Sequence, residues 1–257
     1  MDKSTLLMNR LEAIGKSLAG RESALALIGL GSVGLELDRL DQYSDLDFFV
    51  IVKSGYKHAY LEDLSWLKEV SPVGYTFFNT QDGCKLLFED GVFCEFAVFD
   101  EVELRTAVFS PGRIIWKAEG VSDDLTIPQR VLTKEEPHSI EWLVGEALTN
   151  LYVGLCREKR GEKLSAFRFI QGYAVDRVLE LLERIETPTS AARDAFNVER
   201  RFEERFPSTT QNLPDFLQGY AKNRDSAKAI LTFLEAHFEI NAAIKMAILE
   251  LYDELIK

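Results

Sequence analysis

The hydrophobic period of this sequence changes partway along the chain, and that change constrains the fold more than any other feature. Residues 1 to about 135 contain short β-rich runs after one leading helix, whereas residues 138–257 repeat apolar side chains every three or four positions. The first pattern is typical of short strands and the second of amphipathic helices. We therefore expect an α+β protein, with a small mixed-sheet domain over residues 1–135 and an all-α helical bundle over residues 136–257.

The first half is expected to contain one helix, over about residues 3–19, and six strands. Glu89-Asp90-Gly91 predicts a hairpin turn between the fourth and fifth strands. The expected strands lie at residues 24–30, 46–52, 73–78, 84–88, 92–99 and 113–118. Prolines and clustered charges make residues 118–139 the candidate linker.

The second half is expected to be helical throughout. An apolar stripe begins at Ile140, a charged break turns at Gly161, and the pattern resumes from Leu164 to Ile185. Further helices are expected at about residues 190–206 and 223–256, and the long apolar face of the last one is compatible with either a monomer or a homodimer.

Composition excludes several classes of protein. The net charge of -12 disfavours a nucleic-acid partner, because phosphate binding depends on Lys and Arg side chains. No apolar run approaches the roughly 18 residues needed to span a membrane, and the N-terminal segment lacks the pattern of a secretory signal, which indicates a cytoplasmic protein. Cys84, Cys94 and Cys156 have no CxxC spacing, so buried reduced thiols are expected and a disulfide or zinc site is not.

The stretch LIGLGSVGLELDRLDQYSDLDFFVIV, residues 27–52, carries two competing motifs. Gly29, Gly31 and Gly34 match the glycine spacing of a dinucleotide-binding turn. That motif also needs a helix returning across the sheet and an acid at the end of the next strand. Only ten residues separate Gly34 from Asp45, and the acids stand at the start of the strand, so the dinucleotide interpretation is the weaker one.

The second motif is a pair of carboxylates suited to a divalent metal. Strand side chains alternate between faces, so Asp45 and Asp47 share one face while Leu46 and Phe48 point to the core. Two like charges so close are costly unless a cation lies between them. Hard oxygen ligands of this kind favour Mg²⁺.

A third acid and a small-residue turn accompany the pair. Glu95 is the single charge within an otherwise apolar strand from Val92 to Phe99, where a buried carboxylate would be expensive. The alternative is a glutamate on the solvent face of an edge strand. Gly31-Ser32 closes the first strand, and its backbone and hydroxyl can approach phosphate oxygens.

These elements resemble the nucleotidyltransferase superfamily that includes DNA polymerase beta and the antibiotic nucleotidyltransferases. The family signature places Gly-Gly or Gly-Ser after an apolar residue and, beyond a spacer, Asp, apolar, Asp or Glu, apolar. Here Leu30-Gly31-Ser32 is followed after twelve residues by Asp45-Leu46-Asp47-Phe48, and Glu95 matches the third carboxylate. The segment DQYSDLDFFVIVK looks most like lincosamide and aminoglycoside nucleotidyltransferases, in which a helical domain helps to hold the acceptor.

The resemblance implies an Mg²⁺-dependent enzyme that transfers AMP from ATP, or another nucleoside monophosphate, to a hydroxyl of a small molecule and releases pyrophosphate. Asp45 and Asp47 would hold Mg²⁺, Gly31 and Ser32 would hold the triphosphate, and Glu95 would complete a metal site or act as general base. An antibiotic, and so antibiotic resistance, is one possible context. The same fold without turnover, a nucleotide-binding or antitoxin-like relative, is the alternative, and a polynucleotide-directed transferase is a third that the acidic charge disfavours.

Two parts of the expected site stay open. Where many relatives have Ala-Arg-Gly, this sequence has Val33-Gly34-Leu35, so the basic contact to the triphosphate is unassigned among Arg39, Lys163 and Arg168. The acceptor is expected between the strand domain and the first helices of the bundle. The acids that could hold a cationic acceptor there are Glu141, Glu146 and Asp176.

Overall fold

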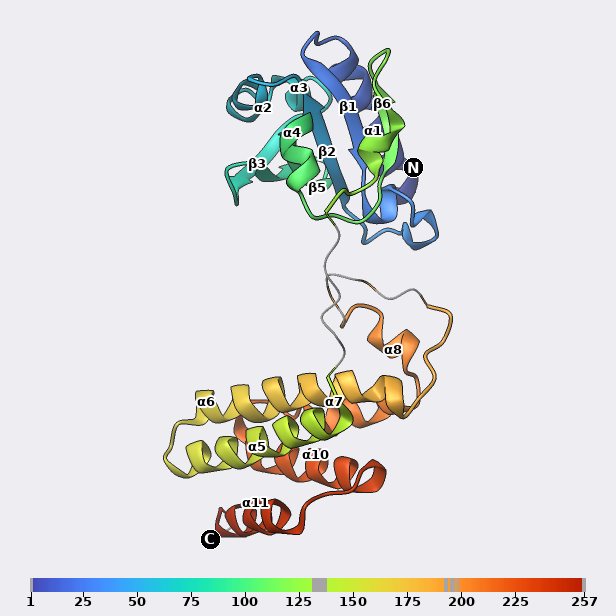
Figure 1. Ribbon diagram of the computed structural model, residues 1–257. Helices are drawn as coiled ribbons and strands as arrows, with labels where there is room; N and C mark the ends of the chain where they lie inside the picture. The colour runs from blue at the N-terminus through green and yellow to red at the C-terminus, as the bar shows by residue number, and fades with distance from the viewer. Residues whose placement is uncertain (1, 131–137, 192–193, 195–196, 198, 256–257) are drawn as a thin grey trace. The chain divides into compact units, whose positions relative to one another are not determined.

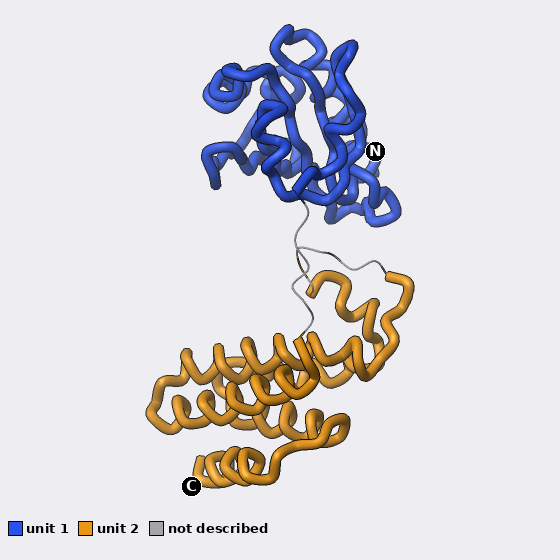
Figure 2. Tube along the Cα trace, viewed as in Figure 1, with its two compact units in different colours: residues 1–133 blue, residues 134–257 orange. Residues whose placement is uncertain are grey.

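The computed structural model describes residues 2–130, 138–191, 194, 197 and 199–255 (Figure 1). The chain divides into two compact units, Met1–Thr133 and Lys134–Lys257 (Figure 2). The expected domain boundary at residue 135 and the second part of the expected linker lie outside the described residues.

Among the described residues, the first unit holds one mixed sheet of six strands in the order β3-β4-β5-β2-β1-β6. Strands β2 and β5 are parallel, and the other neighbouring pairs are antiparallel. The strands are β1 (Ala24–Gly29), β2 (Leu46–Val52), β3 (Val73–Phe78), β4 (Gly83–Phe88), β5 (Phe93–Asp100) and β6 (Arg113–Lys117). Each lies within one residue of its expected bounds, so the α+β fold class is confirmed.

One face of the sheet is buried by helices. Helices α1 (Lys3–Ala19), α2 (Lys57–Glu62) and α3 (Ser65–Lys68) contribute apolar side chains to the same core as the inward residues of β2, β4 and β5. At its centre Phe48 stacks on Phe96 with ring centroids 5.3 Å apart, and Trp66 meets Phe96 edge-on at 5.3 Å. We call this the helix-covered face.

The other face of the sheet has a smaller core. Helix α4 (Glu101–Thr106) follows β5 directly and begins at Asp100, whose carboxylate accepts from the backbone N–H groups of Val102 and Glu103. Its Leu104 packs with Ile51 of β2 and with Phe109. Because this core gathers around the second half of β2, the first half of that strand is less covered. We call this the open face.

The turn between β4 and β5 is a hairpin, as expected. Gly91 has a φ of +82° and donates its N–H to the carbonyl of Phe88 at 2.9 Å. Arg10 of α1 forms an ion pair with Asp90 and lies over the ring of Phe88, 4.4 Å from its centroid. The hairpin is thereby attached to α1.

The second unit is a helical bundle. Its helices are α5 (Ile140–Lys159), α6 (Lys163–Phe167), α7 (Val175–Leu181), α8 (Phe202–Arg205), α9 (Leu213–Phe216), α10 (Asn223–His237) and α11 (Ala242–Glu254). A π-helical segment, Arg168–Ala174, joins α6 to α7. Its buried Gln171 hydrogen-bonds the backbone N–H and carbonyl of Gly219 and the side chain of Asn223, which ties the segment to the start of α10. The short 3-10 turns of both units are Gly31–Val33, Leu37–Arg39, Asp123–Thr126, Leu182–Arg184, Thr209–Asn212 and Tyr220–Lys222.

Two of the helix predictions for this half are wrong. The single helix expected over 223–256 is broken, because Phe238 is extended and the side chain of Asn241 caps a new helix by accepting from Ala243 and Ile244. Between 190 and 206, the described residues are helical only in α8. There the side chains of Asp194 and Asn197 accept backbone N–H groups three and two residues ahead, which competes with helical hydrogen bonding.

The three cysteines are free thiols, as expected. Cys84 and Cys94 lie in the core under the helix-covered face, and Cys156 is half-buried. Burial raises the pKa of the Cys94 thiol well above its usual range, so it stays protonated.

Candidate active site

The glycine-serine turn lies directly beside Asp47. The N–H of Leu30 donates to the backbone carbonyl of Asp47 at 2.8 Å, and Gly31 then turns with a φ of +51° into a short 3-10 segment. A Cβ placed on Gly31 would lie 3.7 Å from Oδ2 of Asp47, so this carboxylate reaches toward the turn. The structure therefore brings together Gly31 and Asp47, which are sixteen residues apart in the sequence.

Arg113, the first residue of β6, braces the same turn. Its Nε donates to the carbonyl of Gly34 at 3.1 Å and its Nη2 to the carbonyl of Val33 at 3.0 Å. The sequence analysis did not single out Arg113. No local signal marks it, because the contact depends on the antiparallel pairing of β1 with β6, which sets Gly29 opposite Arg113.

The acids and one lysine form a row across the open face. In the parallel pairing of β2 with β5, Asp47 is the partner of Glu95, and in the pairing of β5 with β4, Glu95 is the partner of Lys85. Lys85 Nζ lies 2.8 Å from Glu95 Oε1. Asp45 immediately precedes β2 and is half-buried. We call Asp47, Glu95 and Lys85 the acid row.

Charge coupling shows that these groups are neighbours. The hydrogen bond and charge of Glu95 raise the pKa of Lys85 above its usual range, and the charges of Asp45 and Asp47 raise it further. Lys85 was also missed in the sequence analysis. It sits at an outward position of an ordinary strand, where a lysine usually signals only a solvated face.

Of the two expectations for Glu95, burial is wrong, and the solvent face is correct whereas the edge strand is not. Strand β5 lies inside the sheet between β4 and β2, so Glu95 is not on an edge strand. Its side chain is nevertheless 40% exposed, so it is not a buried carboxylate either. The reason is the open face, where α4 covers the far end of the strands and leaves the acid row accessible.

The donor set suits a metal that shares its ligands with substrate. Among the residues that the structure describes, no three His, Cys, Asp or Glu side chains converge closely enough to form a metal cage. Mg²⁺ does not require one, since it binds through one or two carboxylates together with waters and phosphate oxygens. Asp45 and Asp47 fit that mode. They lie at the start of β2, beside a turn that can approach phosphate oxygens.

The other candidate residues are more dispersed. Arg39 forms an ion pair with Glu36 in the loop after the turn. Lys163 and Arg168 are exposed residues of the second unit, and Glu141 and Glu146 are exposed on α5. Asp176 of α7 is half-buried, and that burial raises its pKa. Asp176 is thus the least solvated of the three acids considered for the acceptor.

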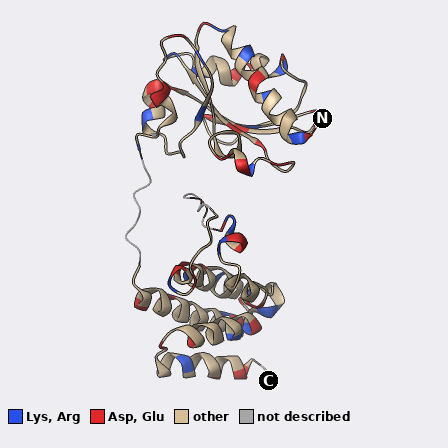
Figure 3. Ribbon diagram, turned by 90° about the vertical axis from the view of Figure 1, so that its right-hand side faces the viewer, with Lys and Arg blue, Asp and Glu red and all other residues tan. Residues whose placement is uncertain are grey.

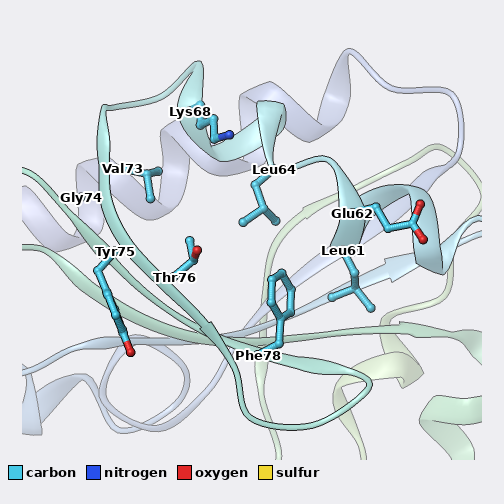
Figure 4. A pocket seen from close by; sticks show the side chains of 9 residues that line it. All are labelled: Leu61, Glu62, Leu64, Lys68, Val73, Gly74, Tyr75, Thr76 and Phe78. Carbon is cyan, nitrogen blue, oxygen red and sulfur yellow. The ribbon is translucent and has the colours of Figure 1, made fainter.

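An open pocket of about 480 Å³ lies away from the acid row, between α2, α3 and the edge strand β3 (Figure 4). Thr76 and Phe78 line it and pair with Leu86 and Cys84, whose side chains belong to the core under the helix-covered face. The remaining lining residues are Leu61, Glu62, Leu64, Lys68, Val73, Gly74 and Tyr75. The pocket therefore opens on the opposite side of the sheet from the candidate site.

Acidic and basic side chains are interspersed over both units (Figure 3). The net charge of -12 disfavours binding to a phosphate backbone, which depends on clustered Lys and Arg side chains. Within the described part of the chain, no helix is both long and apolar enough to cross a bilayer.

Comparison with known proteins identifies structural rather than sequence similarity. No family model matches the chain, and no curated protein matches its sequence. Among solved structures, it is similar to an aminoglycoside 6-adenyltransferase from Bacillus subtilis, with 12% identity over 100% of this chain and 96% of that chain and a TM-score of 0.35. It is also similar to the CCA-adding enzyme of Thermotoga maritima in complex with tRNA, with 13% identity, 96% and 72% coverage and a TM-score of 0.35.

A third similar structure is the STING-associated CdnE c-di-GMP synthase from Capnocytophaga granulosa, with 12% identity, 100% and 81% coverage and a TM-score of 0.32. At these identities and TM-scores the similarities carry no inference about the activity of this chain, which is argued from its own residues.

Proposed function

We propose that this protein is an Mg²⁺-dependent nucleotidyltransferase that transfers a nucleoside monophosphate, AMP from ATP, to a hydroxyl of a small molecule. One observation carries the proposal. The Gly31 turn, the Asp47 carboxylate and Glu95 lie on the open face of one sheet, at the start of two parallel strands. Their proximity supports the proposed roles of a phosphate-binding turn, a metal ligand and a base.

Each residue has a distinct proposed role. Gly31 and Ser32 bind the β and γ phosphates through the turn, and Arg113 keeps the turn in shape through the carbonyls of Val33 and Gly34. Asp45 and Asp47 would hold Mg²⁺, and the bound ion would supply positive charge against the phosphates. Phosphoryl chemistry of this type depends mainly on positioning and charge, so the protein needs few other groups.

Glu95 is proposed as the base. The acceptor oxygen attacks the α phosphorus, its proton passes to a Glu95 carboxylate oxygen, and the bond to the pyrophosphate oxygen breaks. Because Glu95 lies between Asp47 and Lys85, we expect the acceptor to approach over β4 and β3. Phe77 and Leu87 are exposed on that part of the sheet and suit an apolar portion of the acceptor.

Residues 136–257 are proposed as an acceptor-binding domain. A half-buried carboxylate such as Asp176 gains more from a cationic amine than a fully solvated one does, which supports an acceptor of aminoglycoside or lincosamide type. We further propose a cytoplasmic protein without a nucleic-acid partner.

The second candidate is a nucleotide-binding relative that does not turn over, including an antitoxin-like one. The ion pair between Lys85 and Glu95 favours it, because the Glu95 carboxylate already has a partner within the protein. The two candidates share nucleotide binding and differ in pyrophosphate release.

Thermal melting with and without nucleotide tests the binding that both candidates require. ATP at a hundred times its Kd should stabilise the folded protein by about 2.7 kcal/mol, provided that Mg²⁺ is present. The shift should disappear in Asp45→Asn/Asp47→Asn and persist in Glu89→Gln, an acid on the exposed β4–β5 turn. A magnesium-independent shift with NADH would instead support the dinucleotide interpretation of the glycines.

Pyrophosphate release with ATP, Mg²⁺ and a panel of hydroxyl acceptors then separates the two candidates. Release that requires both an acceptor and Glu95 supports the transferase. A nucleotide-dependent stabilisation without release from any member of the panel supports the protein without turnover.

A further inference from the structure

Two carboxylates of the candidate site turn away from each other. The strand order places β4, β5, β2 and β1 side by side, so Glu95 on β5 and Asp47 on β2 are direct neighbours. The Asp47 carboxylate reaches toward the Gly31 turn that follows β1. Glu95 Oε1 points the other way, to Lys85 Nζ on β4 at 2.8 Å. The acid row is therefore split between a turn side and a lysine side.

The ion pair explains why the acids do not form a cage. Adjacent strands lie about 4.8 Å apart, close enough for neighbouring carboxylates to share one cation if both turned inward. No three acids in the described portion of the chain do so. With Lys85 36% and Glu95 40% exposed, the pair contributes little to folding stability. The ion pair instead fixes the direction of the Glu95 carboxylate.

We propose that Lys85 is a positioning residue that holds Glu95 out of the metal's ligand set, so that Asp45 and Asp47 alone supply protein ligands to a single divalent cation. Glu95 is thereby kept for the acceptor hydroxyl. The inference rests on the proposed function, because it concerns the metal and the base of that same site.

In the site without nucleotide, charge balance supports one cation rather than two. Three carboxylates, one ammonium and one divalent cation sum to zero charge, whereas a second divalent cation would leave an excess of two positive charges. A second metal bound through Oε1 of Glu95 would also lie close to the Lys85 ammonium group. Like charges at that distance repel strongly in a partly covered site.

Binding of Mn²⁺ without nucleotide tests the proposal directly. We would count bound Mn²⁺ by electron paramagnetic resonance in the wild type, Asp47→Asn, Glu95→Gln, Lys85→Met and Lys85→Met/Glu95→Gln. Lys117→Met is the matched control, because Lys117 is a similarly exposed lysine of the same unit, paired with Asp123 at 2.7 Å. The melting temperature of each variant establishes that it is folded.

The wild type should bind one Mn²⁺, and Asp47→Asn should weaken binding by about 10- to 100-fold. Glu95→Gln should leave the affinity within about twofold. Lys85→Met should tighten binding by about tenfold, because it frees the Glu95 carboxylate as a third ligand. The double variant should return to the wild-type affinity. This coupling between the two substitutions is explained only if the loss of Lys85 releases Glu95. Lys85→Arg should behave as the wild type.

Two results would overturn the proposal. Glu95→Gln that weakens Mn²⁺ binding as much as Asp47→Asn would make Glu95 a ligand in the wild type. Lys85→Met with unchanged affinity would remove the positioning role. In both cases the metal site at Asp45 and Asp47 survives, whereas Mn²⁺ binding that ignores Asp47, or no Mn²⁺ binding even with a non-hydrolysable ATP analogue present, would overturn the proposed function as well.

Discussion

The two faces of the sheet in the first unit carry different chemistry although they alternate along the same strands. Phe48 and Asp47 are consecutive residues of β2. Phe48 is fully buried between aromatic rings on the helix-covered face, whereas Asp47 is half-buried on the open face beside the Gly31 turn. Because strand side chains alternate, one segment can supply both the core and the site. Substitutions one residue apart, at Phe48 and Asp47, should therefore affect stability and activity separately.

The largest expected effect is on the helix-covered face. Phe48→Ala removes a ring that stacks on Phe96 and meets Trp66 edge-on, and should lower the free energy of unfolding by about 3–5 kcal/mol. Urea denaturation followed by circular dichroism measures it. Phe77→Ala is the control on the open face, where the side chain is 50% exposed, and should cost less than about 1 kcal/mol. Equal losses would mean that both faces contribute to the core.

The next effect is confined to the open face and concerns activity. Asp47→Asn keeps the shape of the side chain and removes its charge, so kcat/KM for nucleotidyl transfer should fall by about 10²- to 10³-fold. The melting temperature should stay within about 2 °C of the wild type. Glu89→Gln should change neither quantity. An Asp47→Asn protein with normal turnover would show that the open face is not the catalytic one.

A smaller effect is expected at the turn that borders the open face. Arg113→Met breaks two charged hydrogen bonds to the carbonyls of Val33 and Gly34 and should destabilise the protein by about 1.5–3 kcal/mol. The substitution should also weaken nucleotide binding, because the turn loses the hydrogen bonds that hold its shape. Differential scanning calorimetry with and without ATP measures both. If nucleotide affinity is unchanged in a folded Arg113→Met protein, the turn does not hold the phosphates.

The smallest effect concerns the ion pair that attaches α1 to the β4–β5 hairpin. Burial raises the pKa of Asp90, but the Arg10 guanidinium and the N–H of Val92 lower it more, so the net pKa lies below the usual range. The stabilisation is therefore complete above the ordinary pKa of an aspartate, about 3.9, and is lost as the pH falls through the lower folded-state value. Since the Asp90 side chain is 39% exposed, the pair should contribute less than about 1 kcal/mol.

Thermal melts of the wild type and Asp90→Asn from pH 7 to pH 3 check this prediction. The difference between the two proteins should shrink below about pH 3.9, as protonation of the unfolded-state carboxylate removes the advantage of the folded ion pair. Asp123→Asn, which removes a far more exposed partner of Lys117, is the control. A difference that persists unchanged at low pH would show that Asp90 acts through packing rather than through its charge.

The sheet was easier to predict than the helical unit. Each strand is a short apolar run bounded by Gly, Pro or Asp, so its ends are marked locally. In the last part of the chain, the apolar stripe continues through residues 238–241, and the break depends on a cap at Asn241 that the periodicity does not reveal. The π-helical segment was likewise unforeseen, since its Gln171 is fixed by Gly219 and Asn223, about fifty residues further along.

The sequence was sufficient to predict which segments form strands and that a small-residue turn precedes Asp45 and Asp47. These properties depend on residues within a few positions of one another, where the period of the backbone decides the direction of a side chain. Three contacts depend on the tertiary structure. They are the pairing of Glu95 with Asp47, the ion pair of Lys85 with Glu95, and the hydrogen bonds from Arg113 to the turn. Those contacts depend on which strands pair and in which register, because pairing brings together side chains that no local pattern relates.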